Sequence, residues 1–170
     1  MRSSKLTGII LKRSNYGDAN KILTVFTREI GKTKLMAKGI RRIKSRRAPH
    51  LELFNLTELV VYKEIITEAK VIDDYSKLKS DLKTTGYLFY LAEVLDKILP
   101  EHQPHEEVFD KLRRSLPSLK SLTSLKNIVV ELMWDLGYLP KGDYPKERLT
   151  EFVESVVERK IRSKKFIEQI

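Results

Sequence analysis

The side chains best suited to chemistry gather in residues 37–47, where six of eleven residues are Lys or Arg and none is acidic. Such cations neutralise phosphate, and the planar arginine fork pairs bidentately with phosphate oxygens. Residues 1–50 hold fourteen cations against Asp18 and Glu29, a net charge of +12, whereas the complete chain carries +10. This asymmetry predicts a polyanionic partner, most commonly a nucleic acid backbone, although a merely solvated loop has the same composition.

Seven cations are the predicted phosphate contacts, and one aromatic ring is the predicted base-stacking group. The ring belongs to Tyr16 in the polar turn 14–18, and stacking a base on an exposed ring contributes roughly 1–3 kcal/mol. Phe26 and Phe54 flank the cationic stretch, but their alternation with polar residues predicts burial in the core. The predicted nucleic-acid-binding residues are Arg13, Tyr16, Lys38, Arg41, Arg42, Lys44, Arg46 and Arg47.

The sequence contains no complete residue pattern for catalysis or metal binding. Gly31-Lys32-Thr33 resembles the end of a phosphate-binding loop, yet Phe26 stands where that loop needs its first glycine. His102 and His105 are spaced like metal ligands but have no third donor of matching spacing, and a helix cap explains Asp73-Asp74. We therefore expect no catalytic residue, no metal and no cofactor, so the chain is not predicted to be an enzyme.

Cysteine content and hydropathy limit the cellular compartments in which the chain is expected. The chain has no cysteine, which excludes disulfides, thiolate zinc sites, iron–sulfur clusters and a cysteine nucleophile. No apolar run approaches the roughly 20 residues that cross a bilayer. The apolar stretch 8–11 is also shorter than the roughly 7–15 residues of a signal-peptide core. The sequence therefore predicts a cytoplasmic protein without a membrane partner.

The elements that must position these side chains begin with strands. Between Lys5 and about Tyr75, five runs rich in strand-forming residues are bounded by turn residues, and Gly31 lies near a hairpin tip. Five short strands in about seventy basic residues predict an OB-type β-barrel over residues 1–76. The runs are 6–11, 22–27, 33–37, 56–62 and 66–72.

Beyond these strands the apolar period changes from two to about 3.6 residues, which predicts an α-helical domain over residues 77–170. Asp74 or Ser76 is the expected cap of its first helix, whose apolar face includes Leu82. The chain as a whole is therefore predicted to be α+β. The expected helices span about 76–99, 104–116, 123–136 and 145–169.

Short motifs in both parts of the chain resemble one family, the bacterial recombination mediator RecO. They occur in the same order along both modules, which makes the resemblance specific. The motifs are 8–12 (GIILK), 16–22 (YGDANKI), 24–27 (TVFT), 31–32 (GK), 37–42 (AKGIRR), 45–46 (SR), 51–54 (LELF), 136–140 (LGYLP) and 162–166 (RSKKF).

The resemblance implies a role in DNA repair and recombination. It implies binding to single- and double-stranded DNA, annealing of complementary strands without ATP, and a location at the nucleoid. It also implies cooperation with RecR and with the C-terminal tail of the single-strand binding protein, and indirectly with the recombinase RecA. An RNA-binding OB-fold protein and an adaptor for an acidic partner remain alternatives.

One departure from the family pattern concerns zinc. Many family members insert a four-cysteine zinc module after the Gly-Tyr-x-Pro segment. Here residues 141–144 lead directly into the last expected helix. The chain therefore resembles a short form without the zinc module.

The last expected helix pairs an apolar stripe, Phe152, Val156 and Ile161, with a cationic end. The resemblance assigns tail capture to the helical domain, and an acidic peptide with apolar ends would suit this combination. The stripe could equally be core, with the cations complementing the helix dipole. The predicted tail-binding residues are Arg159, Lys160, Arg162, Lys164 and Lys165.

Overall fold

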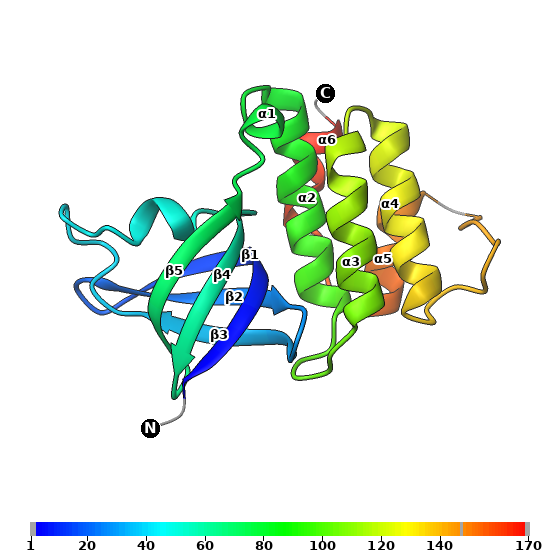
Figure 1. The fold of residues 1–170 in the computed structure, drawn as a ribbon. Helices are drawn as coiled ribbons and strands as arrows, with labels where there is room; N and C mark the ends of the chain where they lie inside the picture. Colours follow the sequence, from blue (N-terminus) through cyan, green and yellow to red (C-terminus); the bar gives the residue numbers. More distant parts are fainter. Residues whose placement is uncertain (1–2, 147, 169–170) are drawn as a thin grey trace. The chain divides into compact units, whose positions relative to one another are not determined.

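The structure is a computed structural model that describes residues 3–146 and 148–168. The chain divides into two compact units. One consists of Met1–Tyr75 together with Pro100–Glu106, and the other of Ser76–Leu99 together with Glu107–Ile170. The first unit is built on β-strands and the second on helices, as Figure 1 shows.

Five strands close into a barrel in the order β1-β2-β3-β5-β4. β1 pairs with β4 from Ser4 to Ile9 and with β2 from Gly8 to Tyr16, and a bulge between Ile10 and Lys12 interrupts the pairing with β2. A bulge bends a strand and increases its twist, which lets one strand serve both sides of a closed barrel. The predicted OB-type barrel is therefore confirmed. The strands are β1 (Ser4–Tyr16), β2 (Asn20–Thr27), β3 (Gly31–Ala37), β4 (Leu56–Tyr62) and β5 (Ile65–Asp73).

The barrel interior is filled by aliphatic side chains from all five strands. Ile10, Leu23, Leu59 and Ile66 have no exposed surface, and burying each such side chain contributes roughly 1.5–3 kcal/mol. Phe26 and Phe54 are also buried, as their alternation with polar residues predicted. These two rings are therefore not available to stack on bases.

The segment between β3 and β4 contains the cationic stretch and is built of turns. Residues 38–47 form turns and bends, and a short 3₁₀-helix, η1 (Ala48–Leu51), follows. Leu51 of η1 is 1% exposed and joins the barrel core. The cationic residues 38–47, hereafter the cationic loop, therefore project from a segment whose far end is fixed by core packing.

The hairpin between β2 and β3 receives the segment Pro100–Glu106. Gly31 has a φ of 76°, and a Cβ at this position would lie 2.0 Å from the carbonyl oxygen of Gln103. The backbone N–H of His102 donates to the carbonyl oxygen of Lys32 over 2.9 Å. Glycine is required here both for its left-handed conformation and for the close approach of a second backbone.

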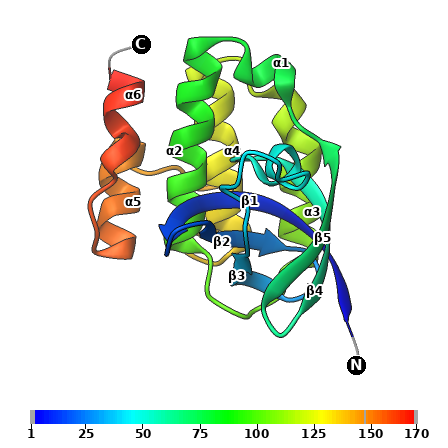
Figure 2. The same ribbon diagram turned by 90° about the vertical axis from the view of Figure 1, so that its left-hand side faces the viewer.

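The helical unit is organised around α2. In Figure 2, α2 lies between α4 and the C-terminal elements α5 and α6, all of which it contacts. No helix in the described parts of the chain is both long enough and apolar enough to cross a membrane. The elements are α1 (Ser76–Lys79), α2 (Leu82–Ile98), α3 (Glu106–Ser115), η2 (Leu116–Ser118), α4 (Leu122–Asp135), α5 (Leu149–Val157), η3 (Arg162–Lys164) and α6 (Lys165–Glu168).

The first expected helix is divided in two. The Asp81 carboxylate accepts a hydrogen bond from the backbone N–H of Thr84 over 2.9 Å and caps α2, which therefore has a cap other than the expected Asp74 or Ser76. Leu82 is 85% exposed instead of facing the core. The Asp81 cap satisfies backbone donors that have no partner within the helix where α2 begins. A new helix can therefore start here although the apolar period of the sequence continues through this point.

The last expected helix is also interrupted. α5 ends at Val157, Glu158 takes a left-handed conformation with a φ of 52°, and an irregular segment leads to η3 and α6. Gln169, the expected end of this helix, lies outside the described residues. Ile161 is only 1% exposed, so this member of the expected stripe is core. The apolar period of the sequence continues across this break, because the segment after the turn packs against the same core as α5.

Candidate nucleic-acid interface

Hydrogen bonds fasten the cationic loop to the turn between β1 and β2. The backbone N–H of Arg41 donates to the carbonyl oxygen of Ala19, and its guanidinium donates to that of Gly17, each over 3.0 Å. The N–H of Gly39 donates to the Asn20 side chain over 2.8 Å. Turn and loop therefore lie at one end of the barrel, where they are drawn in blue and cyan (Figure 1).

Arg47 closes the base of the same loop. Its Nη2 donates to the carbonyl oxygen of Lys38 over 2.7 Å, and its Nη1 donates to the carbonyl oxygen of Ile66 on β5. Hydrogen bonds from charged groups stabilise by about 1.5–3 kcal/mol. Arg41 and Arg47 therefore hold the loop in place with donors that the sequence assigned to phosphate.

Four of the predicted phosphate-binding side chains point into solvent. Their side chains are exposed and, among the described residues, make neither a hydrogen bond nor an ion pair: these are Lys38, Arg42, Lys44 and Arg46. Ile43 in their midst is also fully exposed. The cationic loop thus presents four unpaired positive charges to solvent on an anchored backbone.

Arg13 and Lys21 form a second cluster of cations at the same end of the barrel, hereafter the barrel mouth. Arg13 pairs in register with the core residue Leu23, so its side chain is on the inner face of the sheet, and its guanidinium forms an ion pair with Glu52. Lys21 lies on the same face, two residues before Leu23. Burial lowers the pKa of Lys21, and the positive charges of Arg13 and Arg41 lower it further, against an opposing effect of Glu52.

Lys21 is a member of the site that the sequence reasoning missed. Lys21 lies in the motif 16–22, outside the cationic stretch 37–47 that predicted the phosphate contacts. The signal that could have found it is the hairpin register, which pairs Asn15 with Lys21 and so places it diagonally from Arg13.

Tyr16 ends β1 at the edge of this surface. Its partner across the strand pair is Asn20, and the ring is 51% exposed. Because the cationic loop is hydrogen-bonded to the turn that Tyr16 enters, the exposed ring and the free cations lie at the same end of the barrel. The arrangement can hold a phosphate backbone and leave one ring for a base.

The cations near the C-terminus are arranged differently from the expectation. Lys160 and Lys164 each form an ion pair with the Glu154 carboxylate at 3.4 Å, whereas the side chains of Arg159 and Arg162 have no such partner among the described residues. Lys165 lies 5.4 Å from the centre of its neighbour's ring, that of Phe166. Two of the five predicted cations therefore share one carboxylate within the protein.

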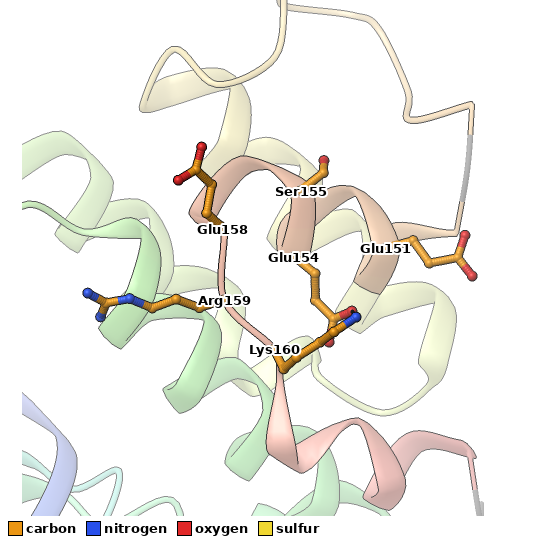
Figure 3. Close-up of a pocket in the computed structure, with 6 residues that line it drawn as sticks. All are labelled: Glu151, Glu154, Ser155, Glu158, Arg159 and Lys160. Carbon is orange, nitrogen blue, oxygen red and sulfur yellow. Dashed lines mark hydrogen bonds and ion pairs between the residues drawn. The ribbon is translucent and has the colours of Figure 1, made fainter.

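An open pocket of about 350 Å³ lies beside these residues in the helical unit. Figure 3 shows Lys160 beside Glu154, with Arg159 directed away from both. Three carboxylates against two cations make the pocket itself a poor receptor for an acidic ligand, which could meet Arg159 only on the side directed away from Glu154. Its lining residues are Glu151, Glu154, Ser155, Glu158, Arg159 and Lys160.

Glu93 on α2 fixes the start of η3. Its carboxylate accepts hydrogen bonds from the backbone N–H groups of Arg162 and Ser163, at 2.9 and 2.7 Å, from the Ser163 hydroxyl and from the Lys97 ammonium. Burial alone would raise the pKa of Glu93, but these bonds outweigh it and lower the pKa to about 2. The motif 162–166 therefore has a structural role in closing the helical unit.

Metal chemistry finds no support in the described residues, which contain no group of three His, Cys, Asp or Glu able to hold a metal ion. His105 is half-buried, and its Nε2 has no hydrogen-bond partner within residues 3–146 and 148–168. The candidate site consists of cations and one aromatic ring, whose chemistry suits a polyanion.

Comparison with known proteins finds relatives of this chain among DNA repair proteins. The chain is 30% identical over 148 residues to the DNA repair protein RecO of Roseiflexus sp. (strain RS-1), covering 82% of this chain and 52% of that protein. It is 31% identical over 152 residues to the DNA repair protein RecO of Thermoanaerobacter sp. (strain X514), covering 84% of this chain and 61% of that protein. The chain thus spans little more than half the length of these relatives.

Two family profiles match in the order of the two units. Residues 1–75 match the profile described as recombination protein O N terminal, and residues 79–143 match recombination protein O C terminal. The first match covers the five strands and the second covers α2 to α4. The chain therefore belongs to the recombination protein O family of DNA repair proteins.

Proposed function

We propose that this chain is a DNA-binding recombination mediator that anneals complementary strands without ATP and performs no covalent chemistry. The observation that carries the proposal is the set of four unpaired, exposed cations on a loop that hydrogen bonds anchor to the barrel. Family membership supplies the repair context. The proposed place of action is the nucleoid in the cytoplasm.

Annealing needs two strands to approach while their bases stay free. Two phosphate backbones repel each other, and cations that neutralise phosphate reduce this repulsion and release bound counterions. Lys38, Arg42, Lys44 and Arg46 carry this role, and Tyr16 offers a sequence-tolerant stacking platform. Because phosphate contacts do not depend on base identity, both single- and double-stranded DNA are proposed ligands.

The test is the salt dependence of binding by a variant that lacks the four free cations. The variant Lys38→Ala, Arg42→Ala, Lys44→Ala, Arg46→Ala should show a shallower slope of log affinity against log salt on single strands. The expected change is about 0.7 for each phosphate that the variant no longer neutralises, or roughly 3 in total. A matched control removes four exposed lysines elsewhere, at positions 70, 83, 126 and 141. Equal slopes for variant and control would show that the loop is only a solvated surface.

Activity is tested by annealing of complementary oligonucleotides with purified protein and no nucleotide. The wild-type chain should accelerate annealing, and the four-alanine variant should lose most of the acceleration. A requirement for ATP would contradict the mediator proposal. Tighter binding of ribose than of deoxyribose strands would instead favour an RNA-binding role, because the 2′-hydroxyl is what distinguishes the two.

The proposed partners are RecR, the C-terminal tail of the single-strand binding protein and, indirectly, the recombinase RecA. For the acidic tail, we propose the cations of residues 159–165, chiefly Arg159, Arg162 and Lys165, because Lys160 and Lys164 already pair with Glu154. A labelled tail peptide should bind the full chain and lose affinity in the variant Arg159→Ala, Arg162→Ala, Lys165→Ala. Unchanged peptide binding in that variant would exclude this surface.

A further inference from the structure

We propose that the mouth of the barrel is a phosphate subsite in which the Glu52 carboxylate occupies the place of a DNA phosphate until DNA replaces it. The subsite is formed by Arg13, Lys21 and Arg41. The inference rests on the proposed DNA binding and adds to it a residue that opposes binding in the free protein. Glu52 follows η1 and is exposed, whereas Arg13 is held on the inner face of the sheet.

The geometry begins with the Arg13–Glu52 ion pair. The two residues are 39 positions apart in the chain, and a guanidinium nitrogen of Arg13 donates to a carboxylate oxygen of Glu52. The side chain of Arg13 is 20% exposed, whereas that of Glu52 is 51% exposed. A solvent-facing carboxylate therefore covers a largely buried arginine, and its departure would open the guanidinium to an anion from outside.

The guanidinium of Arg13 is also incompletely satisfied. Its Nε is buried and donates to no hydrogen-bond acceptor in the described part of the chain. A guanidinium presents five N–H donors in a fixed fork, and an anion with several oxygens can engage more of them than the present contact does. A phosphodiester can bring two unesterified oxygens to this fork.

The surroundings favour an anion with more charge than Glu52 supplies. Lys21 lies within electrostatic reach of Arg13, Arg41 and Glu52, so three cations and one carboxylate share the barrel mouth, a net charge of +2. Burial depresses the pKa of Lys21, and the nearby charges of Arg13 and Arg41 depress it further, so the cations are close enough to repel one another. A phosphate brought in with its neighbours on a strand reduces this repulsion, while Glu52 moves into water.

The subsite is continuous with the cationic loop. Arg41 donates to Gly17 in the β1–β2 turn and is part of the loop, so a strand that follows Lys38 and Arg42 passes the barrel mouth. Successive phosphates can therefore contact the loop and the subsite together. A phosphate can enter the subsite only by displacing Glu52. The subsite is therefore filled by a polyanion that the cationic loop already holds.

The test compares Glu52→Gln, which keeps the side-chain shape and a hydrogen-bond acceptor, with the wild-type chain. Fluorescence anisotropy with a labelled oligothymidine should show affinity raised by about three- to tenfold at low salt, since one repulsive charge is removed. Glu58→Gln is the matched control, because Glu58 pairs with Lys5 on the exposed side of β1 and β4. This control should leave affinity within about twofold of the wild-type value.

Two outcomes separate this inference from the proposed function. If the wild-type chain binds no DNA, the proposed function fails; if it binds and Glu52→Gln binds equally or more weakly while remaining folded, the subsite fails. Should Glu52→Gln not fold, the Arg13 Nε–H resonance of the wild-type chain supplies the measurement. It should shift on addition of oligothymidine, and an unchanged resonance under saturating DNA would also overturn the inference.

Discussion

The guanidinium of Arg47 donates to the carbonyl oxygen of Lys38 across the base of the cationic loop, at 2.7 Å. The neighbouring Arg46 is exposed and, within the described residues, has no partner. Two adjacent arginines of the same stretch therefore have different roles, since one shapes the loop and the other is available to a ligand.

Replacement of these two arginines by alanine should separate stability from binding. Arg47→Ala should lower the free energy of unfolding by about 1.5–3 kcal/mol, because it removes hydrogen bonds from a charged donor. Arg46→Ala should stay within about 0.5 kcal/mol of the wild-type stability and make the salt slope shallower by about 0.7. Urea melts and salt titrations measure both. A stability loss in Arg46→Ala with none in Arg47→Ala would reverse these roles.

Substitutions at Tyr16 should report on base stacking. Tyr16→Ala should weaken binding to single strands by roughly 1–3 kcal/mol, whereas Tyr16→Phe keeps the ring and should retain nearly all the affinity. The ring is 51% exposed, so neither change removes core packing. Anisotropy with oligothymidine gives the affinities, and equal losses in the two variants would point to the hydroxyl instead.

The helical unit should lose stability in acid through Glu93. Its pKa is lowered from 4.5 to about 2 on folding, so the ionised carboxylate stabilises the folded state above about pH 4.5. This contribution disappears as the pH falls from about 4.5 towards 2. Glu93→Gln should lower the free energy of unfolding at pH 7 by about 2 kcal/mol and flatten the pH dependence in that window.

Circular dichroism melts between pH 2 and 7 test the Glu93 prediction. The control is Glu151→Gln, which removes an exposed carboxylate from α5. Parallel pH profiles for the wild-type chain and Glu93→Gln would show that the bonds to Arg162 and Ser163 contribute little.

Gly31→Ala should destabilise the barrel more than Gly17→Ala. Both glycines have positive φ, 76° and 57°, so alanine incurs a backbone cost of about 1–2 kcal/mol at either position. Only at Gly31 would the new Cβ meet the backbone of Gln103, while the nearest atom at Gly17 lies 3.9 Å away. The extra loss should be about 1–3 kcal/mol by urea melts, and equal losses would mean that Pro100–Glu106 yields readily.

The barrel was predictable because the signals for its strands are local. Alternation and turn residues located all five strands, and Phe26 and Phe54 were correctly expected in the core. The helix breaks at Asp81 and Glu158 were missed because apolar periodicity continues through both. Periodicity identifies an apolar face, whereas a cap or a left-handed residue decides whether the backbone stays continuous and whether a periodic residue such as Leu82 reaches the core.

The composition of the candidate site was visible in the sequence, but the division of roles within it was not. Six cations in residues 37–47 predict affinity for phosphate without distinguishing the anchoring Arg41 and Arg47 from the free side chains. The Arg13–Glu52 pair joins residues 39 positions apart, and no local pattern encodes such a contact. Lys21 became part of the site only through strand register.

The docking of Pro100–Glu106 on the β2–β3 hairpin makes the barrel unit discontinuous in sequence. Residues 1–75 emerge from the ribosome before residues 100–106 do, so the nascent barrel initially lacks this segment and the hydrogen bond from His102 to Lys32. Completion of the barrel must wait until at least thirty more residues have left the exit tunnel. A fragment cut at the end of β5 reproduces this unfinished intermediate and not the mature unit.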